Sequence, residues 1–239
     1  MNTALLTTLV LGFALGMKHA LDADHVVAVS TIVSQYRNPL KATLVGIFWG
    51  IGHTATLLLV GIAVIVFKLA IPDQLALSME FLVGVVLFAL GVQILWQYRP
   101  IKKHIHIHDH GSELHAHEHI DHRKGDGEDV QHHSPRQHRS LLLGMIHGLA
   151  GSAALMLLVL STIQSPVEGV VYILIFGVGS ILGMMVISTL IGLPFALSSG
   201  RFASLNHTIR FIAGSLSTVL GIFVMIDIGF VKGLFWGLY

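Results

Sequence analysis

A short polar segment inside a long apolar stretch carries the first residues that could do chemistry. Residues 18–25 read KHALDADH and lie between the apolar runs 4–17 and 26–33. An ionised residue at the centre of a membrane helix costs about 2.5–3.5 kcal/mol, so the lysine and two aspartates need compensating partners. Imidazole nitrogens and carboxylate oxygens bind divalent transition metals. The segment therefore indicates a buried cation site.

The spacing of these residues leaves two arrangements open. On a continuous helix that turns about 100° per residue, His19, Asp22 and His25 lie on one face, at about 0°, 300° and 240°. Asp24 lies off that face, at about 140°. It joins the site if the helix is interrupted, as helices often are in transporters, and otherwise it orients a ligand histidine.

Two further histidines lie in other apolar stretches, His53 within WGIGHT and His147 within GMIHGL. Either could complete the coordination from a neighbouring helix, and the alternative for each is an interhelical hydrogen bond. For His19 and His25 the alternative is a structural polar network or a proton relay. The candidate metal ligands are His19, Asp22, Asp24, His25, His53 and His147.

The elements that must position these residues are apolar helices. The chain is 54% hydrophobic and 11% charged, where a soluble domain has about a quarter charged residues. About 20 apolar residues span a membrane as a helix. Six stretches qualify, at about 4–33, 40–69, 79–98, 141–163, 168–197 and 209–230. The sequence predicts an all-α polytopic membrane protein with six transmembrane helices.

The two halves of the chain look like copies of each other. Gly16-Met17-x-His19 recurs 128 residues later as Gly144-Met145-x-His147. Three spans per copy is an odd number, so the second copy must be inverted in the membrane, an arrangement typical of secondary transporters. We expect one three-helix repeat over 1–98 and a second over 140–239. Small residues four apart favour close helix packing, and they recur at Gly12/Gly16, Gly46/Gly50 and Gly179/Gly183.

The segment 99–139 between the repeats differs from the rest of the chain. It holds eleven of the 16 histidines, many charges and almost nothing apolar, so it is expected to be largely disordered without a ligand. Most imidazoles are neutral near pH 7, and so many of them make a chelating tract for transition metals. The alternative is a solvated linker with incidental histidines.

Basic residues near span ends mark the cytoplasmic side of a membrane. They flank the first, third and fifth loops, whereas the second and fourth loops offer only Lys68. We therefore expect a multi-pass protein of the cell (inner) membrane, with both termini outside and the histidine-rich loop in the cytoplasm. The absence of cysteine excludes disulfides and thiolate ligands, and a net charge of +1 gives no support for a nucleic-acid partner.

The polar segment resembles a known family. GMKHALDADH at 16–25 resembles the His-x4-Asp-His signature of the nickel/cobalt transporter (NiCoT) family, and Gly52-His53-Thr54 looks like its second motif. GMIHGLAGS at 144–152 is similar to the UreH-type short relatives. The resemblance implies Ni²⁺ or Co²⁺ transport with His19, Asp24 and His25 as signature positions. Typical members have eight spans and second-half acidic residues, where this chain has Ala150, Gly151 and Ser152.

The leading hypothesis is a secondary transporter that takes up Ni²⁺ or Co²⁺, with Zn²⁺ as a third candidate, since the membrane potential drives cations inward. Related efflux proteins also carry histidine-rich loops, so efflux stays open. A third hypothesis is an accessory protein that hands metal to a cytoplasmic metallochaperone. The chain has no His-Glu-x-x-His motif for an intramembrane metallohydrolase. No enzyme activity and no prosthetic group are expected; the partners are the metal ion and the lipid bilayer.

Overall fold

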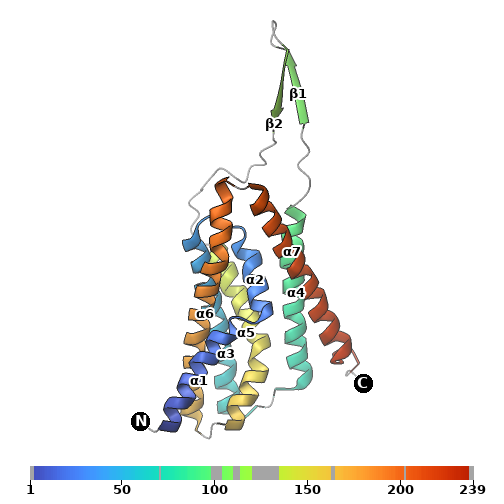
Figure 1. The fold of residues 1–239 in the computed structure, drawn as a ribbon. Coiled ribbons are helices and arrows are strands. Elements are labelled where there is room, and N and C mark those ends of the chain that lie inside the picture. The colour runs from blue at the N-terminus through green and yellow to red at the C-terminus, as the bar shows by residue number, and fades with distance from the viewer. Residues whose placement is uncertain are drawn as a thin grey trace.

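The computed structural model describes residues 3–69, 71–97, 104–109, 114–119, 135–162, 165–201 and 203–236. Seven α-helices make up most of this part of the chain (Figure 1). They are α1 (Thr3–His19), α2 (Ala23–Val33), α3 (Pro39–Phe67), α4 (Asp73–Gln97), α5 (Pro135–Thr162), α6 (Pro166–Arg201) and α7 (Ala203–Ile226). The last helix continues into a π-helical turn, η1 (Asp227–Val231).

Four helical stretches are long and apolar enough to cross a membrane. They are Pro39–Phe67, Asp73–Gln97, Pro166–Ser198 and Ser204–Val231. Large apolar side chains such as Leu59, Phe223 and Val219 are exposed on these helices, as expected where lipid replaces water as the solvent. The predicted helical membrane architecture is therefore confirmed at this coarser level, with four candidate spans in the described residues.

The predicted first span, 4–33, is not one helix. Its helix α1 ends at His19, residues 20–22 form a turn, and α2 begins at Ala23. The amides of Leu21 and Asp22 bond to carbonyls three residues back, at 2.9 and 3.0 Å, which tightens the chain out of the α-helix. Aspartate side chains compete with helical backbone bonding, and Asp22 has extended backbone angles of −61° and 144°. Of the two arrangements left open by the sequence, the interrupted helix is the one observed.

Close helix contacts surround this break. A methyl group on Gly16 of α1 would overlap the carbonyl oxygen of Phe176 in α6. A methyl group on Gly144 of α5 would overlap the backbone of Trp49 in α3. The spacing of small residues predicted close packing, and at these two crossings only glycine lets the backbones meet. Trp49, Leu57, Leu87 and Met184 are the largest apolar side chains buried between the helices.

The histidine-rich segment contains a hairpin. Strands β1 (His104–Asp109) and β2 (Leu114–His119) pair antiparallel. The hairpin stands at one end of the helical bundle, whereas α1 begins and α7 ends at the other (Figure 1). Residues 135–139, predicted as part of the loop, instead form the first residues of α5. Residues 99–103, 110–113 and 120–134 lie outside the described residues, so disorder of the segment stays a prediction.

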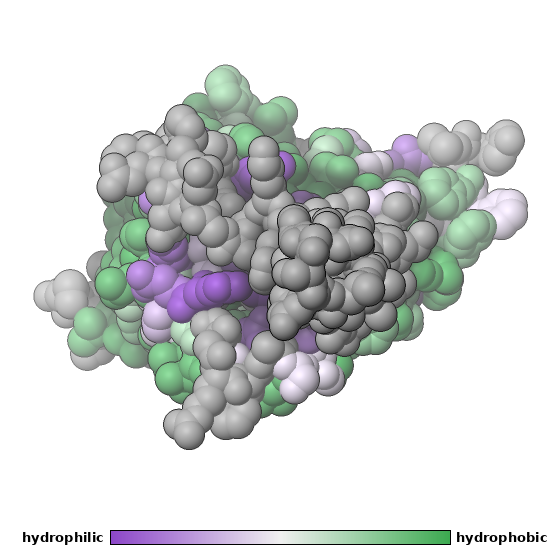
Figure 2. All heavy atoms as spheres, turned by 90° about the horizontal axis from the view of Figure 1, so that it is seen from above, coloured by the Kyte–Doolittle hydropathy of each residue, from purple (hydrophilic) through white to green (hydrophobic). Residues whose placement is uncertain are grey.

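Seen from the hairpin end, hydrophobic side chains lie along much of the visible outline of the bundle, and a group of hydrophilic side chains lies inside that outline toward the left of the view (Figure 2). Such a distribution suits a protein whose sides contact lipid.

Candidate metal site

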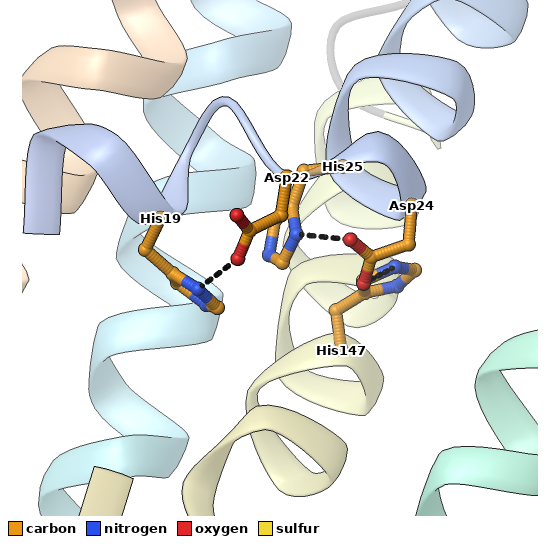
Figure 3. A network of polar contacts seen from close by, with 5 residues as sticks. All are labelled: His19, Asp22, Asp24, His25 and His147. Atoms are coloured by element: carbon orange, nitrogen blue, oxygen red, sulfur yellow. Dashed lines mark hydrogen bonds and ion pairs between the residues drawn. The ribbon is translucent and has the colours of Figure 1, made fainter. Parts of the chain in front are cut away.

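The break between α1 and α2 brings together the histidines that the sequence separates. His19 is the last residue of α1, and Asp24 and His25 are in the first turn of α2. Figure 3 shows these side chains pointing toward one another, with His147 of α5 reaching them from a second helix. His53 of α3 completes the group, with its ring 5.1 Å from the rings of both His19 and His25.

Asp22 holds the ring of His19 in place. The Nδ1 atom of His19 donates a hydrogen bond to Oδ2 of Asp22, with a separation of 2.7 Å. That bond leaves Nε2 of His19 as the ring's free lone pair, and this atom is buried. The Asp22 side chain is itself half exposed. The sequence predicted Asp22 as a ligand; in the structure its Oδ2 atom accepts from His19, the kind of contact that commonly orients a metal-binding histidine. The ligand role of Asp22 stays a prediction.

Asp24 links two helices. Its Oδ1 atom lies 3.1 Å from Nδ1 of His25 on the same helix, and its Oδ2 atom lies 3.6 Å from Nε2 of His147 on α5. Because α2 starts afresh after the turn, Asp24 faces the histidines, although it would lie off their face on a continuous helix. The interruption therefore gives the site its carboxylate.

His19, His25, His53 and His147 carry ring nitrogens without a hydrogen-bond partner in the described part of the chain. His25, His53 and His147 are at most 1% exposed. Buried polar atoms are almost always hydrogen-bonded, because an unpaired one costs stability. Six buried ring nitrogens nevertheless have no hydrogen-bond partner among the described residues: Nε2 of His19, Nε2 of His25, and both nitrogens of His53 and of His147. Neutral imidazoles arranged in this way suit a divalent transition-metal ion.

The donor atoms fall into two groups of three. His19, His25 and His53 form the first triad, and Asp24, His25 and His147 form the second. Within each triad the ligand atoms lie within 4.8 Å of one another. Two donors of one first-row ion stand about 3–4 Å apart, because each lies about 2 Å from the metal. Small rotations of the rings would therefore let either triad close on an ion.

The prediction from sequence did not include the aromatic side chains that contact these histidines. The ring of Trp49 lies 5.0 Å from that of His147, and the ring of Phe176 lies 5.6 Å from that of His19. Trp49 is four residues before His53, so both share one face of α3. This four-residue spacing from His53 is the feature of the sequence that could have identified Trp49. For Phe176 on α6 the sequence offers no signal, because its contact crosses between distant helices.

Comparisons with known proteins point to metal transport. The family model NicO, described as high-affinity nickel-transport protein, matches residues 5–232. The family is one of transporters and not an enzyme class. No solved structure matches the chain.

Three curated relatives carry related names. The chain is 45% identical over 231 residues to the urease accessory protein UreH of Bacillus sp. (strain TB-90), covering 97% of this chain and 96% of that protein. A Methanocaldococcus jannaschii protein assigned by name to nickel/cobalt efflux is 29% identical. The match covers 70% of this chain and 67% of that protein. The high-affinity nickel transport protein of Cupriavidus necator is 28% identical over 78 residues. This match covers 31% of this chain and 21% of that protein.

Proposed function

The chain belongs to the NicO family, described as high-affinity nickel-transport protein, and we propose on that premise that it takes up Ni²⁺ or Co²⁺ through the cluster at the broken helix. The ligands are His19, Asp24, His25, His53 and His147. The observation that carries this proposal is the set of six buried ring nitrogens that have no hydrogen-bond partner in the part of the chain that the structure describes. Nitrogen and oxygen donors without sulfur suit nickel, cobalt and also zinc.

A six-span arrangement of two inverted repeats would support a transport function. Glycine contacts that occur in both halves of the chain support this arrangement. In one half of the chain Gly16 packs against the carbonyl of Phe176, and in the other Gly144 packs against the carbonyl of Trp49. Gly144 lies 128 residues after Gly16, and Phe176 lies 127 residues after Trp49. Each half therefore supplies the same glycine to a matching contact with the other half, which is the reciprocity that a two-fold relation requires.

Two more sets of contacts follow the same exchange. In each set, two residues that pack together have counterparts in the other half of the chain that also pack together. The first set is Gly179 with Phe13 and Gly52 with Leu141, and the second is Gly84 with Gly221 and Gly91 with Gly214. In this proposal α1 and α2 form one broken span that matches α5, and α3 and α4 match α6 and α7. The first span and α5 run in opposite directions through the bundle (Figure 1).

We propose inward movement with the hairpin in the cytoplasm. The basic residues Arg37, Lys41 and Arg139 lie at or near the helix ends on the hairpin side, and such residues favour the cytoplasmic face. A negative interior contributes about 2.3 kcal/mol per charge per 100 mV to cation entry. The expected test result is higher nickel accumulation in intact cells that express the chain than in cells without it. Lower accumulation, with the protein present in the membrane, contradicts uptake and supports efflux.

A second candidate function is suggested by the relative named as a urease accessory protein, with 45% identity to this chain. The chain would then hold nickel at the membrane and deliver it to a metallochaperone without moving it across. Purified protein in liposomes separates these functions. Nickel binding without any entry into the vesicle lumen supports the accessory role, and saturable entry supports the transporter.

Asp22 provides a test of how the site is positioned. We expect Asp22→Ala to lower nickel affinity by about 10–100-fold, because His19 loses the acceptor that orients its ring. Asp22→Asn is expected to restore most of the affinity, since an amide oxygen also accepts from Nδ1. Calorimetric titration of the full-length protein, with the histidines between 104 and 138 replaced by glutamine, measures this site without the loop. Equal affinity in Asp22→Ala and the parent would rule out the positioning role.

A further inference from the structure

The five proposed ligands are spread too widely to act as one shell around one ion. They form two triads that have only His25 in common. His19 and His53 belong to one, and Asp24 and His147 to the other. A single ion about 2 Å from each donor would have to draw all of them inward together, whereas each triad already lies within 4.8 Å.

His25 is placed to serve both triads. Its ring is 4.6 Å from the His19 ring on one side and 4.9 Å from the His147 ring on another. Its Nδ1 atom faces Asp24 at 3.1 Å, and its Nε2 atom is buried without a hydrogen-bond partner among the described residues. His25 also has the buried, central location that a shared ligand needs, at 1% exposure.

The two triads differ in chemistry. The first offers three imidazoles, and the second replaces one imidazole with the carboxylate of Asp24. An ion on either triad keeps open coordination positions, because only three protein donors reach it. Two divalent ions on triads that share a ligand would repel each other strongly in a low-dielectric interior, so one ion at a time occupies the pair.

Resting on the proposed transport function, we propose that the cluster is two overlapping ion positions joined by His25, and that the transported ion passes from one triad to the other. Ligand exchange at His25 lets the ion leave one triad as it gains the other, so it is never released without protein ligands. The open coordination positions accept the incoming donors. Binding at either position alone does not complete transport.

Cobalt absorption spectroscopy tests this proposal on the full-length chain with the loop histidines, 104–138, replaced by glutamine. His147→Ala leaves the all-nitrogen triad, and His53→Ala leaves the triad with the carboxylate. Because nitrogen donors split the cobalt d levels more than oxygen donors, we expect the His147→Ala band at shorter wavelength than the His53→Ala band. A weighted sum of the two spectra should reproduce the parent spectrum at one Co²⁺ per chain.

Flux in liposomes supplies the second readout. Each variant is expected to bind Co²⁺ and yet to lose at least tenfold in transport, whereas the control His207→Ala, which removes an exposed imidazole on α7, keeps the parent rate. Identical spectra in His53→Ala and His147→Ala, or full flux in either, overturn the two-position proposal while transport by the cluster stands. If the parent cluster binds no Co²⁺, the proposed function itself fails.

Discussion

Replacing His25 with alanine is expected to abolish nickel entry into liposomes, with a loss of at least about 100-fold. His25 belongs to both triads, so its removal leaves each with two donors and no shared ligand. Two donors in a buried site cannot replace the water that a divalent ion gives up on leaving solution. The measurement is the initial rate of nickel uptake, followed with a metal-sensitive dye inside the vesicles.

The matched control is His207→Ala, which removes an imidazole that is exposed and belongs to α7. Its rate should equal that of the parent. Both variants should show the parent's helical circular dichroism, so that lost flux reports the site and not misfolding. A His25→Ala protein that is folded and still transports at the parent rate would show that the ion does not pass through this cluster.

Gly144→Val is expected to destabilise the fold by about 3 kcal/mol, the upper end of the usual cost of overpacking. Any side chain at Gly144 would overlap the backbone of Trp49, and backbone cannot rotate away as a side chain can. Gly144 is also three residues before His147, so separation of α3 and α5 would pull His147 away from His53. We expect a lower unfolding temperature together with weaker nickel binding.

Leu142→Ala is the control for this substitution, because Leu142 is on the same helix and 56% exposed. Its effect on stability should stay within about 0.5 kcal/mol. Unfolding in denaturant, followed by circular dichroism in detergent, compares the two variants. A Gly144→Val protein as stable as Leu142→Ala would mean that α3 and α5 do not pack as closely as the structure has them.

Much of the site could be predicted from sequence, because the free-energy cost of polar side chains within an apolar stretch can be recognised from that stretch alone. Charged and imidazole side chains between the apolar runs 4–17 and 26–33 need compensating partners wherever the surrounding helices lie. The same reasoning selected His53 and His147 as histidines in apolar stretches. The structure brings all of these into one cluster, and the NicO family match agrees with the resemblance carried by residues 16–25.

The role of Asp22 and the position of Asp24 could not be predicted with the same certainty, because both depend on the turn at 20–22. On a continuous helix Asp22 would share a face with His19 and His25, and Asp24 would not. The turn instead makes Asp22 an acceptor for His19 and directs Asp24 toward His25 and His147. Helix propensity alone cannot decide such a break, since it is settled by contacts with other helices.

The pairing of β1 with β2 and the division into two triads could not be predicted from the sequence. Alternating histidines at 104–108 and 115–119 indicated a chelating tract, but the pairing of one strand with the other depends on the connection between them. The triads depend on distances between α1, α2, α3 and α5, and these are set by glycine contacts such as that of Gly144 with Trp49. The donor side chains can be read from the sequence, whereas helix packing determines which of them lie within 4.8 Å of one another.

The most direct measurement of the central claim is nickel X-ray absorption on the full-length chain whose loop histidines, 104–138, are replaced by glutamine. The account predicts one bound nickel with scattering from two or more imidazole rings, and it predicts that this scattering disappears in His25→Ala. Nickel surrounded only by oxygen ligands, or an imidazole signal unchanged by His25→Ala, would contradict the claim that the broken helix holds the transported ion.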